Sequence, residues 1–219
     1  MGVDVKRLVQ VKSSEPDRKK HWESTWSEKS VTETSWYQEV PRLSLSMIAH
    51  ASPGLDDPLI DIGGGASMLV DHLLKAGYRN LAVLDISTRA LQQAQQRLGE
   101  DSRQVEWIEA DVTQYDPERK FALWHDRATF HFLTSAEDRA AYVAVLKKAL
   151  TTGGQAVIAT FAPGAPRKCS GLDIIQYDAE TLGLELGPEF VLEEEDQEIH
   201  ITPLGREQKF GVYRFTKNN

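Results

Sequence analysis

The sequence predicts an α/β protein of the Rossmann-like type: a three-layer sandwich around a mainly parallel, seven-stranded sheet that ends in an antiparallel hairpin. From residue 58 onward, short apolar runs alternate with helical stretches, which is the pattern of β-α-β units. The last two apolar runs are joined by the turn at residues 203–206 with no helix between them, which favours a terminal hairpin. The expected strands lie at residues 59–62, 81–84, 105–108, 121–124, 155–161, 198–202 and 210–216.

Three helices are expected between these strands. The first follows a glycine-rich segment and ends at Gly77, because glycine readily adopts a left-handed backbone. The second follows Ser87, with its apolar residues on one side. The third begins after Thr134, whose spacing to Glu137 fits a capping box, and runs toward Gly153.

Length and composition indicate one domain preceded by a short tail. The 219 residues, 41% of them hydrophobic, suffice for one core but are few for two. Residues 1–20 are polar and charged without sustained periodicity, so we expect a flexible tail there. Residues 21–219 are expected to form a single domain that starts with an aromatic helical segment at residues 21–50.

The charge balance excludes several classes of partner. A formal net charge of -8 argues against nucleic-acid binding, which needs clustered basic residues to neutralise phosphates. No apolar run approaches the ~20 residues that cross a bilayer, and the first residues lack a signal-peptide core, so we expect no membrane partner and a cytoplasmic location.

The single cysteine, Cys169, cannot form an internal disulfide. No compact spacing of metal ligands is present, so no metal is expected.

The central motif is an apolar strand that runs into a glycine turn, Leu59-Ile60-Asp61-Ile62-Gly63-Gly64-Gly65-Ala66-Ser67. Glycine lets a backbone approach a ligand closely and take positive φ, although such a turn suits many nucleotide-binding folds. Met68 stands where a dinucleotide fingerprint has its third glycine, which weakens the case for a bound pyrophosphate. Asp61 would repel a phosphate and attract an ammonium group. The motif therefore favours a cationic, phosphate-free adenosine compound over NAD.

Two further acids follow the next two strands. Asp85 ends the second strand, where a carboxylate can accept hydrogen bonds from both ribose hydroxyls. Asp111 comes after the third strand, where it could accept a hydrogen bond from an adenine amino group. Each acid alone could simply cap a helix or turn. Since three acids at three successive strands are harder to explain as caps, we expect a nucleoside site that also includes the neighbouring Ile86 and Val112.

Residues 58–161, with these motifs, resemble the class I S-adenosylmethionine-dependent methyltransferases. In that family the glycine turn and the acids after the second and third strands hold the cofactor, and the terminal hairpin resembles its sixth and seventh strands. The resemblance implies one methyltransferase domain over residues 21–219 and S-adenosyl-L-methionine as the cofactor. The residues it implies for cofactor binding are Asp61, Gly63, Gly64, Gly65, Asp85, Ile86, Asp111 and Val112.

The fourth strand is followed by Trp124-His125-Asp126-Arg127-Ala128-Thr129-Phe130-His131-Phe132, where a substrate would lie. A carboxylate or neutral imidazole there could take a proton from the nucleophile, so the candidate catalytic residues are His125, Asp126 and Arg127. The Asp-Arg pair resembles a segment of thiopurine-type S-methyltransferases and of a branch of protein-lysine methyltransferases, in which it lies between cofactor and acceptor. Alternatively, Asp126 and Arg127 form an ion pair that stiffens the loop, and His131 packs in the core.

The segment at residues 21–37 holds three of the five tryptophans. Trp22 and Trp26 are one helical turn apart and would share a face that covers the cofactor pocket, so both are expected cofactor contacts. The segment resembles the leading helix of the citrate synthase type of lysine methyltransferase. A helix that simply packs its tryptophans on the sheet is the alternative.

The stretch after the fifth strand contains Cys169, and further on Tyr177 and Asp178. Loops at this edge of α/β proteins often carry function, so these residues could touch the acceptor. For Cys169 an incidental loop cysteine is the simpler interpretation, because nothing in the sequence indicates a depressed thiol pKa.

Together the motifs predict an S-adenosylmethionine-dependent methyltransferase that acts on a small nucleophile or on a protein lysine. An NAD(P)-dependent reductase would share the glycine turn and Asp85, but Met68, Asp111 and the terminal hairpin disfavour it. A non-catalytic module that binds the cofactor as a sensor or scaffold is the other alternative, since binding residues do not prove turnover.

Overall fold

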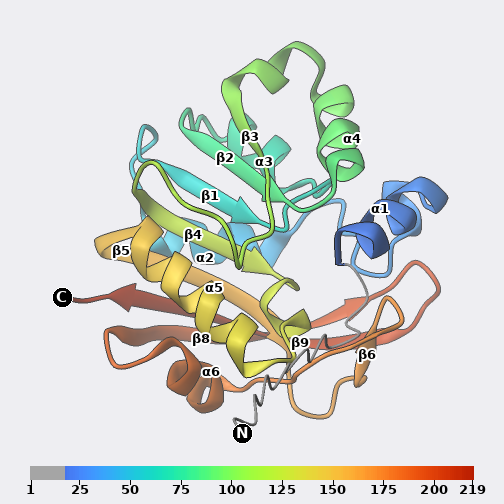
Figure 1. Ribbon diagram of the computed structural model, residues 1–219. Helices are drawn as coiled ribbons and strands as arrows, with labels where there is room; N and C mark the ends of the chain where they lie inside the picture. Colours follow the sequence, from blue (N-terminus) through green and yellow to red (C-terminus); the bar gives the residue numbers. More distant parts are fainter. Residues whose placement is uncertain (1–17) are drawn as a thin grey trace, which may run out of the picture.

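The computed structural model describes residues 18–219, so most of the expected tail, residues 1–17, lies outside the described residues. A seven-stranded sheet in the order β3-β2-β1-β4-β5-β9-β8 forms the middle layer (Figure 1). Its strands are β1 (Leu59–Ile62), β2 (Leu81–Asp85), β3 (Val105–Glu109), β4 (Phe121–Arg127), β5 (Leu150–Phe161), β8 (Phe190–Ile201) and β9 (Glu207–Lys217). A separate two-stranded hairpin consists of β6 (Lys168–Cys169) and β7 (Leu172–Asp173).

Helices cover both faces of the sheet. The α-helices are α1 (Arg18–Glu28), α2 (Arg42–Ala51), α3 (Leu69–Lys75), α4 (Thr88–Leu98), α5 (Ala136–Ala149) and α6 (Ala179–Leu186), and the 3₁₀ turns are η1 (Val31–Glu33), η2 (Gly99–Gln104) and η3 (Phe130–Phe132). Apolar residues of α2, α3 and α4 pack on one face, and those of α5 and α6 pack on the other. β1 and β2 are buried along their whole length, as expected of parallel strands covered on both faces.

The last two strands of the sheet have the antiparallel arrangement that the sequence predicted. β9 pairs antiparallel with β5, and β8 pairs antiparallel with β9. The turn at residues 202–206 joins them without a helix. β8 starts at Phe190, well before the expected strand at 198–202, because its residues pair with the long β9 from Phe190 onward. The Rossmann-like α/β fold with an antiparallel end is therefore confirmed.

Several predicted boundaries were wrong. β4 runs to Arg127, so His125 and Asp126 lie inside a strand and not in a following loop. α1 begins at Arg18, inside the expected tail. The cap of α5 is Ser135, whose Oγ accepts the Asp138 N–H, in place of the expected capping box one residue earlier. β5 follows α5 directly, and the sequence did not predict α6 or the β6–β7 hairpin.

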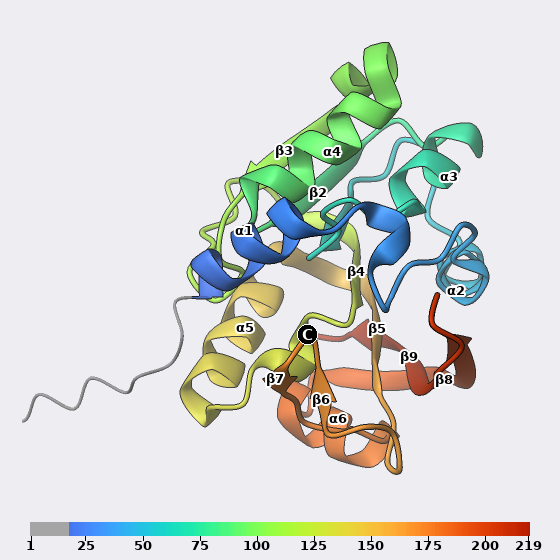
Figure 2. The ribbon, with the colours of Figure 1, turned by 90° about the vertical axis from the view of Figure 1, so that its right-hand side faces the viewer.

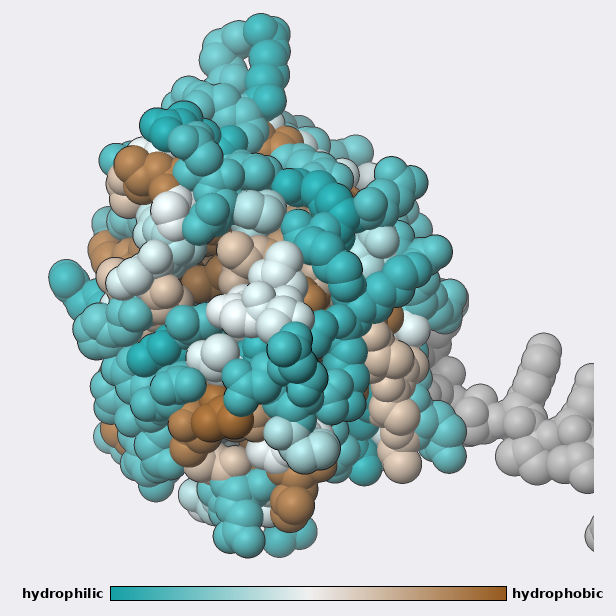
Figure 3. Space-filling model, turned by 90° about the vertical axis from the view of Figure 1, so that its left-hand side faces the viewer, coloured by the Kyte–Doolittle hydropathy of each residue, from teal (hydrophilic) through white to brown (hydrophobic). Residues whose placement is uncertain are grey.

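α1 crosses the carboxyl edge of the parallel strands, between α4 and α5 (Figure 2). The opposite side of the molecule is mostly hydrophilic, with small separate apolar patches (Figure 3). Within residues 18–219 no helix is both long and apolar enough to span a membrane, and no group of three or more His, Cys, Asp or Glu side chains could hold a metal ion. The carboxyl edge beneath α1 is where the predicted site residues gather.

Candidate active site

Two adjoining hollows lie at the carboxyl ends of β1, β2 and β4. The larger cavity has about 790 Å³ of empty space including its open mouth, which is in the range of small-molecule sites. The smaller pocket, about 560 Å³, lies against the glycine turn. Four residues line both hollows, namely Trp26, Trp36, Gly63 and Arg127. One elongated ligand could therefore occupy both by passing Gly63.

The structure brings most of the predicted cofactor residues together. Seven of them line the larger cavity: Trp22, Trp26, Gly63, Asp85, Ile86, Asp111 and Val112. Asp61 and Gly64 line the smaller pocket. Gly65 lines neither hollow, but a Cβ there would lie 2.6 Å from Asp85 Oδ2. Asp85 and Asp111 lie on the same side of the sheet as the turn, as a shared nucleoside site requires.

The glycine turn leaves no room for side chains. Gly63 has φ of +63°, and a Cβ there would lie 1.9 Å from Thr129 Oγ1. A Cβ on Gly64 would lie 2.5 Å from Asp61 Oδ2. Positive φ at Gly63 and close packing against Thr129 and Asp61 both require glycine in this turn.

Arg97 of α4 holds the turn from behind, a role that sequence reasoning missed. Its guanidinium donates to the carbonyl oxygens of Ala66 (2.8 Å) and Ser67 (2.7 Å). It also makes two hydrogen bonds to the carboxylate of Asp71, at 3.0 and 2.7 Å. Such a fork fixes geometry as well as adding energy. The spacing of an arginine some thirty residues from the turn gave no sequence signal for this contact.

Asp85 is 7% exposed at the end of β2, with Oδ1 accepting the Ser87 N–H at 2.8 Å. Burial, helped by the nearby carboxylates of Asp61 and Glu23, raises the pKa of Asp85 to about 7, although the Ser87 hydrogen bond opposes the shift. A carboxyl group balanced in this way becomes a better acceptor for ligand hydroxyls once it ionises.

Asp111 is already engaged by the protein. Its Oδ1 accepts the N–H and the hydroxyl of Thr113, and its Oδ2 lies 3.2 Å from the Arg18 guanidinium. Arg18 also donates to Asp138 of α5 at 3.2 Å. The first turn of α1 is thereby tied to the loop after β3 and to α5.

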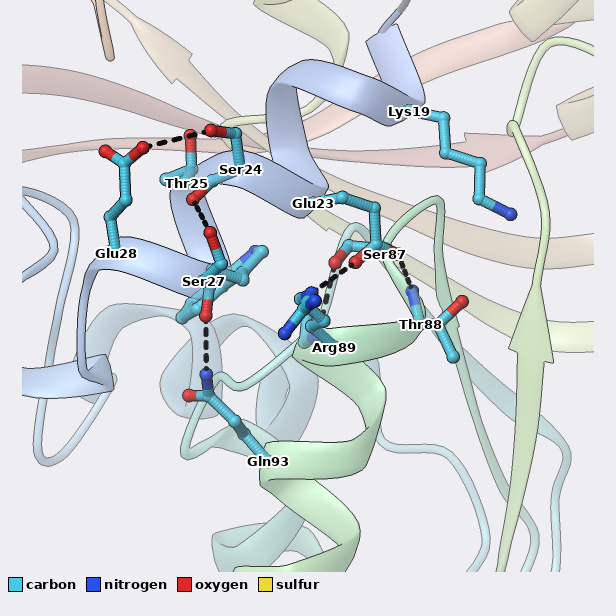
Figure 4. A network of polar contacts seen from close by, with 12 residues as sticks. Lys19, Glu23, Ser24, Thr25, Ser27, Glu28, Ser87, Thr88, Arg89 and Gln93 are labelled. Carbon is cyan, nitrogen blue, oxygen red and sulfur yellow. Dashed lines mark hydrogen bonds and ion pairs between the residues drawn. The ribbon is translucent and has the colours of Figure 1, made fainter.

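Polar contacts hold α1 over the cavity (Figure 4). Glu23 accepts the backbone N–H of Thr88 at 2.7 Å and lies 3.3 Å from Arg89, so it caps the amino end of α4. Gln93 of α4 donates to the carbonyl oxygen of Trp26 at 3.1 Å. Trp26 is the buried residue of α1, so most of this helix rests on polar surface contacts.

Aromatic rings form the wall between α1 and β4. Trp36 makes edge-to-face contacts with Trp22 and with Trp26, both with ring centroids 5.9 Å apart. Trp22 also meets Phe132 edge to face at 5.1 Å. The tryptophans therefore line the larger cavity, and they pack against one another and Phe132 instead of on the sheet.

His125 is buried in the wall of the smaller pocket. Its Nδ1 lies 2.7 Å from Asp61 Oδ1, and its Nε2 lies 2.9 Å from Ser44 Oγ. With both ring nitrogens engaged, His125 is poorly placed to take a proton from an acceptor. The register of β1 with β4 sets Asp61 directly beside His125.

Asp126 lines neither hollow. It is fully buried, and its carboxylate accepts hydrogen bonds from the N–H groups of Thr129 and Phe130 and from the Tyr142 hydroxyl. Burial raises the pKa of Asp126 to about 6, and those hydrogen bonds lower it in part. Within residues 18–219 Asp126 makes no ion pair with Arg127, which was the alternative raised by the sequence. The geometry favours a positioning role, in which Asp126 shapes the turn after β4.

Arg127 is the predicted catalytic residue that reaches the junction of both hollows. Its side chain is 11% exposed and stacks over the Phe210 ring at 4.5 Å. It donates to the Trp36 carbonyl oxygen at 3.1 Å and to Glu198 at a long 3.4 Å. Burial lowers the pKa of Arg127, against the effect of Glu198, yet an arginine this basic stays charged. A buried cation thus lines both hollows, with Glu198 as its carboxylate partner at 3.4 Å.

The remaining candidate residues lie either in the wall of the larger cavity or away from it. Cys169 lines the larger cavity although the sequence favoured an incidental loop cysteine, and burial raises its thiol pKa to about 11. His131 is fully buried, its Nδ1 accepts the Phe161 N–H, and burial lowers its pKa to about 3. Tyr177 packs in the core, and Asp178 caps α6, so neither lines the cavity as was suggested.

Residues 59–154 match the protein family described as "Methyltransferase domain". This segment contains the glycine turn, the acids after β2 and β3, and the whole of β4. The chain has the α/β Rossmann-like methyltransferase fold.

Two curated relatives match parts of the chain. The eEF1A lysine and N-terminal methyltransferase of Danio rerio is 28% identical over 146 residues, which are 65% of this chain and 21% of that protein. Malonyl-[acyl-carrier protein] O-methyltransferase 1 of Ilyobacter polytropus is 30% identical over 104 residues, 47% of this chain and 37% of that protein. The chain therefore spans well under half of the length of either relative.

Solved methyltransferases share the fold. N-methyltransferase NodS from Bradyrhizobium japonicum, in complex with S-adenosyl-L-homocysteine, is 18% identical with a TM-score of 0.71, covering 90% of this chain and 98% of that one. An S-adenosylmethionine-dependent methyltransferase from Anabaena variabilis is 17% identical with a TM-score of 0.74, covering 97% and 100%. The finer resemblance to the thiopurine and citrate synthase branches stays a prediction.

The residues that line the two hollows fit S-adenosyl-L-methionine on chemical grounds. Asp85 and Asp111 offer carboxylates to a nucleoside, Asp61 offers one to an ammonium group, and aromatic faces suit a sulfonium cation. The tight turn at Gly63 and Gly64 admits a close backbone approach.

Proposed function

We propose that the chain transfers a methyl group from S-adenosylmethionine to a small, soft, anionic acceptor such as a thiolate or a halide-like ion. The observation that carries the proposal is the buried Arg127 guanidinium at the junction of the two hollows. A cation in a water-poor site attracts an anion and disfavours a lysine ammonium.

The proposed division of the site follows from the lining residues. The nucleoside part of the cofactor would lie between Asp85 and Asp111, and its amino-acid part along Gly63 and Gly64 in the smaller pocket. The acceptor would lie beside Arg127, against Phe132 and Cys169. When bound, the cofactor supplies a methyl group on a sulfonium centre, which needs a nucleophile with a free electron pair.

Catalysis by this arrangement would depend on aligning the nucleophile with the methyl group more than on acid–base chemistry. Methyl transfer is an in-line displacement, and holding the nucleophile in line is a large part of the catalytic effect. Arg127 would stabilise the ionised form of a thiol acceptor, so that its proton leaves to solvent before transfer. The aromatic wall of Trp22, Trp36 and Phe132 would exclude water from the reacting atoms.

A protein lysine is the second candidate acceptor, favoured by the 28% identity to the eEF1A lysine and N-terminal methyltransferase of Danio rerio. Against it stands the buried Arg127 cation, which repels an incoming lysine ammonium. A non-catalytic cofactor-binding role is the third outcome for the experiment below.

The test is a labelled-methyl assay run in parallel over iodide, hydrosulfide, aromatic thiols, primary amines and extract proteins. Thermal shifts with S-adenosylmethionine, S-adenosylhomocysteine, NAD and NADP accompany it, because a ligand of the folded state raises the melting temperature. We expect stabilisation by the first two compounds and label transfer to a thiol or halide. Label on protein lysines alone would replace the proposed acceptor, and cofactor binding without any transfer would support a sensor.

A further inference from the structure

Three buried polar groups form a chain that ends at the smaller pocket. Ser44 lies on α2, His125 on β4 and Asp61 on β1, and the three are 4%, 3% and 6% exposed. The distances are 2.9 Å from Ser44 Oγ to His125 Nε2 and 2.7 Å from His125 Nδ1 to Asp61 Oδ1. Because Asp61 and His125 occupy paired positions on neighbouring parallel strands, the sheet itself fixes their separation.

The position of the proton between Asp61 and His125 follows from the chemistry of the two groups. An ionised carboxylate can accept hydrogen bonds but not donate them, so His125 Nδ1 carries the proton shared with Asp61. Nε2 is then the ring atom that forms the hydrogen bond with the Ser44 hydroxyl. Every hydrogen-bonding atom of the imidazole is then used inside the protein.

The outer oxygen of Asp61 is left for a ligand. Oδ2 lies against the glycine turn, where a Cβ on Gly64 would come within 2.5 Å of it. Among residues 18–219 the hydrogen bonds of the Asp61 side chain go through Oδ1, and the residue lines the smaller pocket. The imidazole thus fixes one carboxylate oxygen and aims the other along the turn.

We propose that the Ser44–His125–Asp61 chain is a positioning device that selects ligands carrying an amino-acid ammonium group, and that His125 acts on the cofactor through Asp61 instead of on the acceptor. This inference rests on the proposed function for the identity of the cofactor. It replaces the expected catalytic role of His125. Ser44 joins the site through its helix, with no motif in the sequence to mark it.

The experiment is calorimetric binding of two probes. S-adenosylhomocysteine has the amino-acid group, whereas 5′-methylthioadenosine has the same nucleoside and thioether without it. For His125→Ala we expect the affinity for S-adenosylhomocysteine to fall about tenfold or more, with that for 5′-methylthioadenosine changed less than about twofold. His125→Asn, whose amide can replace the Nδ1 donor, should restore much of the loss.

Ser44→Ala provides a second, milder variant in case His125→Ala fails to fold. It should weaken S-adenosylhomocysteine by about threefold, again without affecting 5′-methylthioadenosine. Ser46→Ala, the same change on the same helix outside both hollows, is the matched control. Equal weakening of both probes, or none, would overturn the inference. Failure of the unaltered protein to bind either probe would instead refute the proposed function.

Discussion

The two halves of the proposed site, one for the cofactor and one for the acceptor, are built in different ways. The cofactor half uses short segments at the ends of β1, β2 and β3. Each of its acids lies in one of these strands or within two residues of its end. The acceptor half draws on α1, the loop at Trp36, the end of β4, and the β6 hairpin, with Glu198 of β8 behind Arg127. Positions in the first half are fixed by the parallel sheet, and those in the second by packing between distant segments.

This contrast determines how each half tolerates change. In the cofactor half a single atom can block the ligand, because the backbone itself forms the surface. In the acceptor half, side chains determine the charge and shape of the cavity, so a substitution there can change the ligand preference while the fold is kept. Substitutions in the two halves should therefore affect different ligands.

The greatest loss is expected for Gly63→Arg. Its Cβ would meet Thr129 Oγ1 at 1.9 Å, and its φ of +63° is unfavourable for arginine. We expect the affinity for S-adenosylhomocysteine to fall more than about a hundredfold by calorimetry. The control is Gly153→Arg, at a positive-φ glycine where an added Cβ would meet no atom within 4 Å, and this variant should bind normally. Normal binding by Gly63→Arg would remove the turn from the cofactor half.

Arg127→Gln should come next. Removing the buried cation should lower kcat/KM for an anionic acceptor by about thirtyfold, mainly through KM, while the affinity for 5′-methylthioadenosine stays unchanged. Steady-state kinetics with the best acceptor of the panel measure this. If Arg127→Gln instead weakens S-adenosylhomocysteine relative to 5′-methylthioadenosine, Arg127 binds the cofactor carboxylate and belongs to the other half.

Asp126→Asn tests whether Asp126 belongs to the chemistry or to the scaffold. The amide would place a donor among the N–H groups of Thr129 and Phe130 and the Tyr142 hydroxyl, so the free energy of unfolding should fall by about 2 kcal/mol. Urea unfolding measures the change. Unaltered stability combined with lost turnover would return Asp126 to the reacting groups, as the sequence suggested.

The mildest effect concerns pH. Burial raises the pKa of Asp85 to about 7, so below that pH the group carries a proton and must release it to accept two ribose hydroxyls. Affinity for S-adenosylhomocysteine should therefore rise as pH rises, by about tenfold between pH ~6 and pH ~8. Asp85→Asn should bind weakly with little pH dependence over this range. A wild-type affinity that is flat with pH would place the proton elsewhere.

The fold class, and the gathering of most proposed cofactor residues at one edge of the sheet, could be inferred from the amino-acid sequence without coordinates. Alternating apolar runs and helices specify parallel strands, and strand ends in such a sheet must share one edge, so Asp85 and Asp111 could be placed together. The terminal hairpin followed in the same way from two apolar runs without a helix between them.

The roles of the β4 residues emerged only from the packing of the folded chain. His125, Asp126 and Arg127 are adjacent in sequence, but alternate side chains of a strand point to opposite faces, so Asp126 turns into the core toward Tyr142 while its neighbours face the pockets. Ser44 and Glu198, which contact His125 and Arg127, and Arg97, which holds the turn, come from segments with no local signal. Hydrogen bonds between residues far apart in the chain depend on how whole elements pack, which no local pattern encodes.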